Sequence, residues 1–377
     1  MSQPLRILIV DDSAMMRRLI RSMLEGDPDL AVVGEAADGR EAIARAAELR
    51  PDLITLDVRM PVMDGVETTR QIMAYQPTPI LVLTASLSRY DIDITFQMLG
   101  AGALDVMEKP EISSSADLER AQIALVQKIK LLAKVRVVTH LRGRRKNNGE
   151  WGMGNAELLR QPAPVAAGSS NSAFSIPHSP FPIQHSPFTV VVIGASTGGP
   201  RVVRQILADL PADYAAAVLV VQHIAQGFSA GMVEWMALSS AIPISIAEAG
   251  ASIQPGQVIV APDRFDLVLT SDGRVELSAQ PLLIPHPMID ITMQSAAAIC
   301  GPAATGVLLT GMGRDGAQGM RAIRRAGGYT IAQDEATCTI FGMPKAAIEL
   351  DAVHAVLPPD KIAAALTAHS RKRERRV

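Results

Sequence analysis

Cysteine and aromatic residues are scarce in this chain of 377 residues, with two cysteines and 3% aromatic residues. The two cysteines, Cys300 and Cys338, exclude a disulfide framework and are typical of a protein of the reducing cytosol. No apolar run is long enough to cross a bilayer, and the N-terminus lacks the pattern of a secretory signal. We therefore expect a cytoplasmic protein with no direct membrane insertion.

Charge of one sign is not in large excess either. Lysine and arginine total 36 and aspartate and glutamate 38, so the formal net charge is -2 at pH 7. A chain so close to neutral has no overall field that would attract nucleic acid, and we expect no nucleic-acid partner. The hydrophobic fraction of 48%, with few aromatic residues, is typical of α/β layers, and the length suits two domains.

Short apolar runs alternate with amphipathic stretches in the first part of the chain. Five runs predict buried strands of a parallel sheet, because they show no polar alternation: LRILIV, AVVGEA, LITLDV, PILVLTA and ALDVME. Ser13 and Asp38 are predicted N-caps of helices that end at Glu25 and Leu49, and a closing helix is predicted over roughly Asp117–Val138. This pattern predicts a doubly wound α/β domain.

The periodicity then stops, and the intervening segment is rich in Gly, Pro, Ser and Asn, with the imperfect repeat HSPFPIQ and HSPF. Such a composition is typical of a flexible linker. His178 and His185 lie in it without the Cys or carboxylate partners of a metal site. The predicted division is a first domain over 1–140, a linker over 141–188, a second domain over 189–370 and a basic, solvated tail over 371–377.

A second α/β series follows the linker. Its predicted strands are TVVVIGA, AAAVLVVQH, VIVAP, GVLLTG, YTIAQD and AVHAVLP. Helical patterns cover Pro200–Asp209 and Ala317–Ala326, and LVLTSDGRVELS has the Asp-Gly signal of a β-hairpin. We expect a mostly parallel, Rossmann-like sheet with an antiparallel hairpin.

Polar residues gather at the predicted strand ends of the first domain. Asp11 and Asp12 follow the first strand, Asp57 ends the third, Thr84 the fourth and Lys109 the fifth. The carboxyl ends of parallel strands meet at one edge, where ligands bind. Carboxylates that converge there favour a cation, and Mg²⁺ suits an all-oxygen site that also accepts a phosphate. Thr84 and Lys109 are placed to contact an incoming phosphoryl group.

The segments DDSAMMRRLI, TLDVRMPVMDG, LTAS and EKP resemble the receiver domain of two-component response regulators, which is a flavodoxin-like fold. The resemblance implies that Asp57 is phosphorylated and helps Asp11 and Asp12 to bind Mg²⁺. It also implies that a histidine kinase is the phosphodonor. Two positions depart from the family pattern: Arg59 replaces a common glutamate, and Val106 replaces a common aromatic residue.

The second domain opens with VVVIGASTGGP, which contains G-x-S-x-G as Gly194, Ser196 and Gly198. This spacing is typical of a nucleophile elbow, in which a tight turn after a strand exposes the serine. The next predicted strand ends in His223, at the same sheet edge, where it is a candidate base. Asp315, in the turn of GVLLTGMGRDG, is a candidate for the acid that orients the imidazole.

The same turn also supports a different class of function. Residues Gly311–Gly316 satisfy G-x-G-x-x-G between a strand and a helix, and Asp334 lies about 20 residues further on, as in dinucleotide-binding sites. Against this interpretation, Asp315 puts a carboxylate where a pyrophosphate would lie, and the motif is not in the first strand–helix turn of the domain. From the residues alone, a hydrolase and a phosphorylation-gated dinucleotide-binding module both remain open.

Four long segments resemble the C-terminal domain of the chemotaxis protein-glutamate methylesterases, the CheB family: VVVIGASTGGP, VVQHIAQGFSAGM, VLLTGMGRDGAQGM and IAQDEATCTIFGMPKAAIE. The resemblance implies that Ser196 is the nucleophile, His223 the general base and then acid, and Asp315 the residue that orients His223. Thr197 would lie in the active-site loop, and the Met312 backbone amide would donate to the oxyanion.

The implied activity is phosphorylation-activated hydrolysis of glutamate γ-methyl esters, and deamidation of glutamines, on the cytoplasmic helices of methylated chemoreceptors. No cofactor is implied in the catalytic domain. The segment Pro285–Ser295 and the pair Arg264-Phe265 depart from the family pattern near the substrate cleft. A divergent paralogue that serves a non-chemotaxis receptor array is therefore an alternative. Cys338 is a weaker second nucleophile candidate, and we expect it to be a buried structural thiol.

Overall fold

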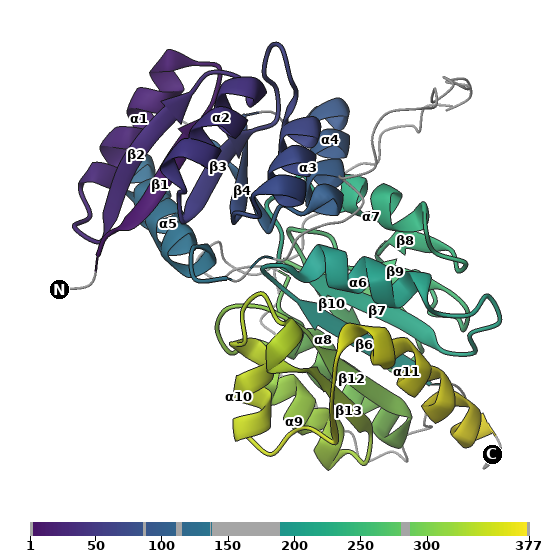
Figure 1. The fold of residues 1–377 in the computed structure, drawn as a ribbon. Helices are drawn as coiled ribbons and strands as arrows, with labels where there is room; N and C mark the ends of the chain where they lie inside the picture. The colour runs from purple at the N-terminus through teal and green to yellow at the C-terminus, as the bar shows by residue number, and fades with distance from the viewer. Residues whose placement is uncertain are drawn as a thin grey trace, which may run out of the picture.

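The computed structural model describes residues 3–85, 88–110, 115–135, 137, 189–279 and 287–374. They form two α/β domains, one N-terminal and one C-terminal, which lie side by side (Figure 1). The predicted linker, with His178 and His185, lies outside the described residues. None of the helices in the described ranges is long and apolar enough to span a membrane.

The N-terminal domain contains one parallel sheet in the order β2-β1-β3-β4-β5. Its strands are β1 (Leu5–Val10), β2 (Leu30–Ala36), β3 (Leu53–Asp57), β4 (Ile80–Thr84) and β5 (Asp105–Glu108). The helices are α1 (Ala14–Glu25), α2 (Gly39–Leu49), α3 (Gly65–Tyr75), α4 (Arg89–Ala101) and α5 (Ser115–Leu132). The predicted flavodoxin-like, doubly wound fold is confirmed by this strand order.

Alternate side chains of the strands face two separate cores. Ile7 and Ile9 pack toward α1 and α5, whereas Leu8 and Val10 pack toward α2, α3 and α4. A strand that is buried on both faces must be apolar throughout, which explains the unbroken hydrophobic runs. The predicted N-caps are confirmed: the Ser13 hydroxyl accepts from the Met16 amide, and the Asp38 carboxylate accepts from the amides that follow it.

The closing helix is shorter than its periodicity predicts. α5 begins at Ser115 and ends at Leu132, six residues before the expected end at Val138. The apolar period continues because Val135 and Val137 still pack against the core. After Leu132 the backbone forms i→i+3 hydrogen bonds, such as Val135 N to Leu132 O at 3.0 Å, in place of helical ones.

The C-terminal domain contains a parallel sheet in the order β14-β13-β12-β6-β7-β9-β8. Its strands are β6 (Val190–Ala195), β7 (Ala217–Gln222), β8 (Ile244–Ile246), β9 (Val258–Val260), β12 (Ala304–Leu308), β13 (Tyr329–Gln333) and β14 (Ala355–Leu357). The chain leaves β6 on one side toward β7 and returns on the other side at β12. The topological switch point therefore lies at β6, where ligands bind in such sheets.

The predicted hairpin is confirmed as β10 (Asp266–Leu269) and β11 (Val275–Ser278), an antiparallel pair that forms its own two-stranded sheet. β8 was not predicted, because a three-residue strand carries too short a periodic pattern. One face of the main sheet is covered by α6 (Gly199–Ala208), α7 (Ser229–Ala237) and α11 (Pro359–Glu374), and the other by α8 (Ile289–Cys300), α9 (Ala317–Arg325) and α10 (Met343–Glu349). α11 includes the first four residues of the predicted tail.

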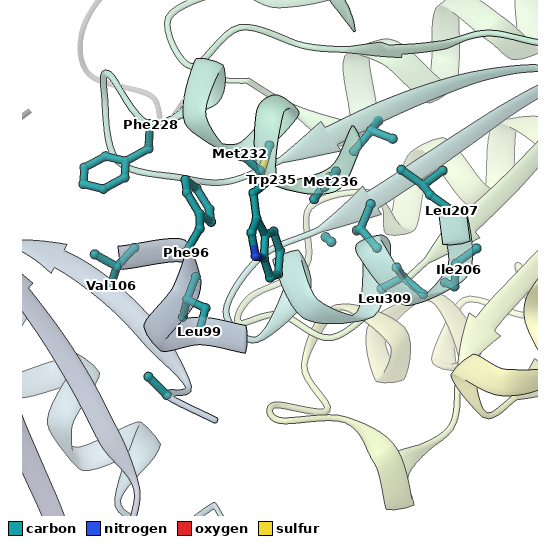
Figure 2. Close-up of a cluster of buried hydrophobic side chains, with 14 of the residues drawn as sticks. Phe96, Leu99, Val106, Ile206, Leu207, Phe228, Met232, Trp235, Met236 and Leu309 are labelled. Carbon is teal, nitrogen blue, oxygen red and sulfur yellow. The ribbon is translucent and has the colours of Figure 1, made fainter. Parts of the chain in front are cut away.

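The two domains share a hydrophobic contact between α4 and α7. Phe96 of α4 stacks on Trp235 of α7, with ring centroids 5.4 Å apart, and meets Phe228 edge-on at 6.4 Å (Figure 2). Gly231 of α7 lies against the same helix, and a Cβ added there would overlap the Cγ2 methyl of Ile92. The glycine therefore lets α7 approach α4 more closely than a side chain would allow.

Candidate active site

Three carboxylates converge at the carboxyl edge of the N-terminal sheet, as the sequence predicts. Asp11 and Asp12 follow β1 and Asp57 ends β3, and their ligand oxygens lie within 4.8 Å of one another. Asp11 and Asp57 are buried, whereas Asp12 is exposed. The Lys109 ammonium lies 2.7 Å from Asp11 Oδ2 and 2.8 Å from Asp57 Oδ2. One buried cation thus holds two buried acids together.

Burial raises the pKa of Asp57 to about 6, and the opposing attraction of Lys109 keeps it from rising further. Thr84 is buried at the end of β4, and its carbonyl accepts from the Lys109 amide at 2.8 Å. Asp12, Asp57, Thr84 and Lys109 line one cavity. An all-oxygen donor set beside an ammonium and a hydroxyl fits a hard cation such as Mg²⁺ together with a phosphoryl group.

The two departures from the receiver pattern have defined surroundings. Arg59 donates to Asp91 of α4, and its guanidinium lies 5.3 Å from the centre of the Tyr90 ring. Arg59 therefore connects the loop after β3 to the start of α4. Val106 is buried in the hydrophobic core. Sequence reasoning did not find Asp91 as the partner of Arg59, because the two lie 32 residues apart.

The predicted Ser, His and Asp lie at three adjacent strand ends of the C-terminal sheet. Ser196 follows β6, His223 follows β7 and Asp315 follows β12, so all three lie at the switch point. His223 Nε2 lies 2.9 Å from Asp315 Oδ2. Ser196 and His223 line one cavity of about 610 Å³. The Ser196 hydroxyl makes no hydrogen bond within the described part of the chain.

Asp315 is surrounded by hydrogen-bond donors. Besides His223, it accepts from the backbone amides of Ile289 at 2.8 Å, Asp290 at 2.9 Å and Gly316 at 2.9 Å. Burial alone would raise the pKa of Asp315, but the hydrogen bonds from His223 and from the amides of Asp290 and Ile289 hold it below its ordinary value. The carboxylate therefore stays ionised and fixes the orientation of the imidazole.

The dinucleotide interpretation of the loop Gly311–Gly316 is not supported by its contacts. A pyrophosphate would need the free amides at the start of α9. The Gly316 amide donates to Asp315 at 2.9 Å, and the Gly319 amide donates to Asp290 Oδ1 at 2.6 Å. Asp334 accepts from the Thr337 amide at 3.2 Å, as the cap of a short 3₁₀ turn. The chain's own carboxylates take the positions that the ligand would need.

Gln222 and Thr310 were not predicted, although both hold the loops that carry Ser196 and His223. The buried Gln222 amide donates to the carbonyls of Ser196 at 2.8 Å and His223 at 2.9 Å. The Thr310 hydroxyl donates to the Thr197 carbonyl at 3.0 Å, and the Thr310 carbonyl accepts from the Ser196 amide. A polar residue that ends an apolar strand, as in VLVVQ and GVLLT, is the sequence signal that could have found them.

The remaining candidates lie around the same loops. Thr197 is buried beside Ser196, whereas the Met312 side chain is 55% exposed. Gly311, which precedes Met312, is closely packed: a Cβ there would lie 2.6 Å from Ser196 Cβ. The Met312 backbone is thus next to a residue in contact with Ser196. Cys338 is only partly buried, not fully buried as expected, because it lines a cavity. This burial still raises the pKa of Cys338 to about 12, so it carries no thiolate near neutral pH.

Known proteins resemble the chain over both domains. A family model of CheB methylesterase matches residues 191–366, and one of the response regulator receiver domain matches residues 7–120. Protein-glutamate methylesterase/protein-glutamine glutaminase 2 of Anaeromyxobacter dehalogenans is 42% identical over 97% of this chain and 96% of that protein. The corresponding protein of Symbiobacterium thermophilum is 39% identical over 97% of each chain.

Among solved structures, the CheB methylesterase catalytic domain of Thermotoga maritima is 37% identical to the chain. The match covers 49% of this chain and 100% of that domain, with a TM-score of 0.48. The relatives from Anaeromyxobacter and Symbiobacterium match across the receiver domain and the methylesterase domain alike. The chain therefore belongs to the CheB family of protein-glutamate methylesterases, in which a receiver domain precedes the methylesterase domain.

Proposed function

We propose that the chain hydrolyses glutamate γ-methyl esters, and deamidates glutamines, on the cytoplasmic helices of methylated chemoreceptors. Its site of action is then the cytoplasm. The observation that carries the proposal is the His223–Asp315 pair at 2.9 Å, because His223 lines the same cavity as Ser196. The names of the related proteins, protein-glutamate methylesterase/protein-glutamine glutaminase, support the same chemistry.

In the proposed reaction the Ser196 hydroxyl attacks the ester carbonyl carbon, and His223 takes the hydroxyl proton. Nε2 of His223 is bonded to Asp315, so Nδ1 is the nitrogen left for this transfer. His223 then gives the proton to the departing methoxy oxygen, which leaves as methanol, or to the departing amide nitrogen of a glutamine, which leaves as ammonia. Water attacks the acyl-enzyme, His223 takes a proton from it and returns it to Ser196, and glutamate leaves.

The hydrogen bond between Ser196 and His223 is expected to form when the ester is bound, because catalytic contacts often tighten only in the substrate complex. Backbone amides of the Thr197 and Met312 loops are assigned to the oxyanion. Removal of one oxyanion donor typically lowers kcat by roughly a hundred- to a thousand-fold. The loop after β6 that carries Ser196, Thr197 and Gly198, here called the serine loop, is held between Thr310 and Gln222. It is therefore fixed before substrate arrives.

Regulation is assigned to the receiver domain. A chemotaxis histidine kinase would transfer a phosphoryl group to Asp57, with Thr84 and Lys109 contacting its oxygens. Mg²⁺ held by Asp11, Asp12 and Asp57 would neutralise the charge of that group when bound. The cavity with Ser196 and His223 has a second wall from receiver residues 105–110, so the receiver covers the cleft in this form. Phosphorylation would shift the population toward an open form.

The experiment that tests the proposal measures methanol released from receptor membranes that carry labelled methyl esters. Receptors of chemotaxis arrays and of other arrays are assayed side by side, because Pro285–Ser295 departs from the family pattern. We expect release from at least one receptor and a clear increase with acetyl phosphate as a phosphodonor. No release from any methylated receptor, by a folded protein with phosphodonor, would overturn the proposal.

Replacement of Asp57 by asparagine is expected to leave basal methanol release within about twofold and to abolish its stimulation by a phosphodonor. The reason is that the amide cannot accept a phosphoryl group, whereas Asp57 lies outside the C-terminal domain. The initial rate of methanol release by the variant is measured with and without acetyl phosphate, and the two rates are compared. Chelation of Mg²⁺ from the wild-type chain is a control that should remove the same stimulation. Stimulation of Asp57→Asn would contradict the assignment.

Replacement of Gly231 by alanine is expected to raise basal activity about fivefold or more and to reduce the stimulation by phosphodonor. The added methyl group would overlap Ile92 of the receiver, whose β-branched side chain has little freedom to move. Overpacking of this kind destabilises the closed form by about 1–3 kcal/mol, so the equilibrium constant for opening rises by the corresponding factor. Within α7 itself alanine is the better helix former.

Gly100→Ala is the matched control for the same contact. Its Cβ would lie 3.7 Å from the Trp235 ring, an ordinary van der Waals distance. Both variants add one methyl group to a helix at the contact of the domains, but only Gly231→Ala forces a clash. Basal rates are compared for both variants without phosphodonor. An unchanged rate for Gly231→Ala, or an equal rise for Gly100→Ala, would refute control by this contact.

A further inference from the structure

Arg201 lies in the first turn of α6, five residues after Ser196, and it is only partly exposed. Among the residues that the structure describes, its guanidinium has no ion pair and no hydrogen bond. Burial lowers the pKa of Arg201, and no neighbouring acid opposes that effect. A half-buried positive charge without a partner is unfavourable, because water is removed from it and nothing replaces the water.

The helix adds to this unfavourable position. The start of a helix carries a partial positive charge, which favours acids and disfavours cations. α6 has no acidic residue in its first turn to offset Arg201. In contrast, Arg204 on the next turn lies over the Trp235 ring at 4.4 Å and donates to Ser239. The described part of the chain thus supplies partners for Arg204 but none for Arg201.

Arg201 lines a second cavity of about 550 Å³, which reaches the loop after β6 at Gly198. The cavity is also lined by Gly198, Gln205, Thr337 and Thr339, and on its receiver side by Leu104 and Val135. Asp360, an acid among the lining residues, lies 3.6 Å from Lys361. The Thr337 hydroxyl donates to Asp334. The Thr339 hydroxyl and the Gln205 side-chain amide can still donate to an anion beside Arg201, so the cavity is suited to a carboxylate.

Two cavities therefore flank one loop. Ser196 and Thr197 line the first, and Gly198 and Arg201 line the second. Each cavity has one wall from the receiver domain, at residues 105–110 for the first and at Leu104 and Val135 for the second. A displacement of the receiver would open both at once. A helical substrate that presents an ester to Ser196 would place a neighbouring turn, 5.4 Å along its axis, beside this loop.

We propose that Arg201 binds an acidic side chain of the substrate helix that presents the methyl ester, and so determines which esters are hydrolysed. This inference rests on the proposed methylesterase function. The planar guanidinium matches a carboxylate in two parallel hydrogen bonds, which makes arginine suited to such recognition. The substrate carboxylate supplies the negative charge that no described residue brings to this guanidinium.

The experiment uses the full chain, with acetyl phosphate, and helical peptides that each carry one glutamate γ-methyl ester. In each peptide a single glutamate occupies one flanking position within two helical turns, with glutamine at that position in the matched peptide. We expect the wild-type chain to prefer the acidic form at one position by about tenfold or more in kcat/KM, through a lower KM. Arg201→Gln should lose this preference, and Arg201→Lys should keep part of it.

Arg325→Gln is the matched control, because Arg325 is an exposed residue of α9 that lines neither cavity. It should keep the wild-type preference. We also expect Arg201→Gln to melt at the wild-type temperature or above it, since it removes an unpaired charge; a lower melting temperature would point to a structural role and count against the proposal. A preference retained in Arg201→Gln, or absent from an active wild type, would overturn the inference. A wild type without hydrolysis would instead overturn the proposed function itself.

Discussion

Replacement of Ser196 by alanine is expected to lower methanol release from methylated receptors by at least about 10⁴-fold, with or without phosphodonor. Without the hydroxyl no acyl-enzyme can form, and His223 has no proton to take. The remaining rate would come from binding and from the oxyanion donors alone. Single-turnover release of labelled methanol, at enzyme concentrations above that of receptor, measures such low rates.

The fold should tolerate this substitution. The Ser196 hydroxyl makes no hydrogen bond within the described residues, so Ser196→Ala should melt within a few degrees of the wild type. Cys338→Ala is the companion variant, because Cys338 is the other nucleophile candidate and its thiol is protonated near neutral pH. It should retain most activity. Activity of Ser196→Ala above about 1% of wild type, or a comparable loss in Cys338→Ala, would refute the assignment of the nucleophile.

Replacement of Asp315 by asparagine is expected to lower kcat by about 10⁴-fold, the loss typical when the acid of such a triad becomes an amide. Asp315 Oδ2 holds His223 Nε2 at 2.9 Å, which leaves Nδ1 for Ser196. An amide group can donate to that nitrogen and so favour the wrong tautomer. The effect is measured by determining kcat of the variant and of the wild type as a function of pH and comparing the two values at the pH optimum.

Asp315→Asn should also reduce stability. Four groups donate to this carboxylate, namely His223 and the amides of Ile289, Asp290 and Gly316. The asparagine NH₂ cannot accept, so at least one buried donor loses its partner, at about 1–3 kcal/mol. Urea unfolding monitored by circular dichroism gives this difference in the free energy of unfolding.

Asp290→Asn separates the two effects. Asp290 accepts from the Gly319 amide at 2.6 Å and so supports the start of α9, but it does not bond to His223. We expect a similar loss of stability and a fall in kcat of no more than about tenfold. If Asp290→Asn and Asp315→Asn lost activity equally, the effect of Asp315 would be structural and its role in orienting His223 would be refuted.

Much of the fold and of the candidate site could be predicted because strand ends are visible in the chain. The runs LRILIV and VVVIGA became β1 and β6 with nearly the expected bounds. Ser196, His223 and Asp315 each follow such a run, and parallel strands bring their carboxyl ends to one edge. The dinucleotide pattern at Gly311–Gly316, in contrast, is a local match in sequence that the tertiary contacts do not support. The amides that it needs are bound to Asp290 and Asp315, which no local pattern reveals.

Other features depend on partners that are distant in the chain. Gln222 ends β7 and Thr310 lies two residues after β12, and neither has a role that its neighbours in the chain indicate. The sheet places both against carbonyls of the loop at Ser196 and Thr197. Arg59 has a partner, Asp91, only because α4 folds against the loop after β3. The contact of Phe96 with Trp235 joins helices of two different domains, and neither helix shows in its own period which partner it meets.

By itself the amino-acid sequence determined most of the order of strands and helices, the polar residues that end the strands and the chemistry that those residues can perform. Hydrophobic periodicity and helix capping depend on residues that are close in the sequence, so they can be recognised from a single sequence. Only the tertiary structure decided that β12 lies beside β6, that Asp315 reaches His223, that the receiver covers the cleft and that Arg201 has no partner among the described residues. These depend on which surfaces meet, and that is set by packing between segments far apart in the sequence.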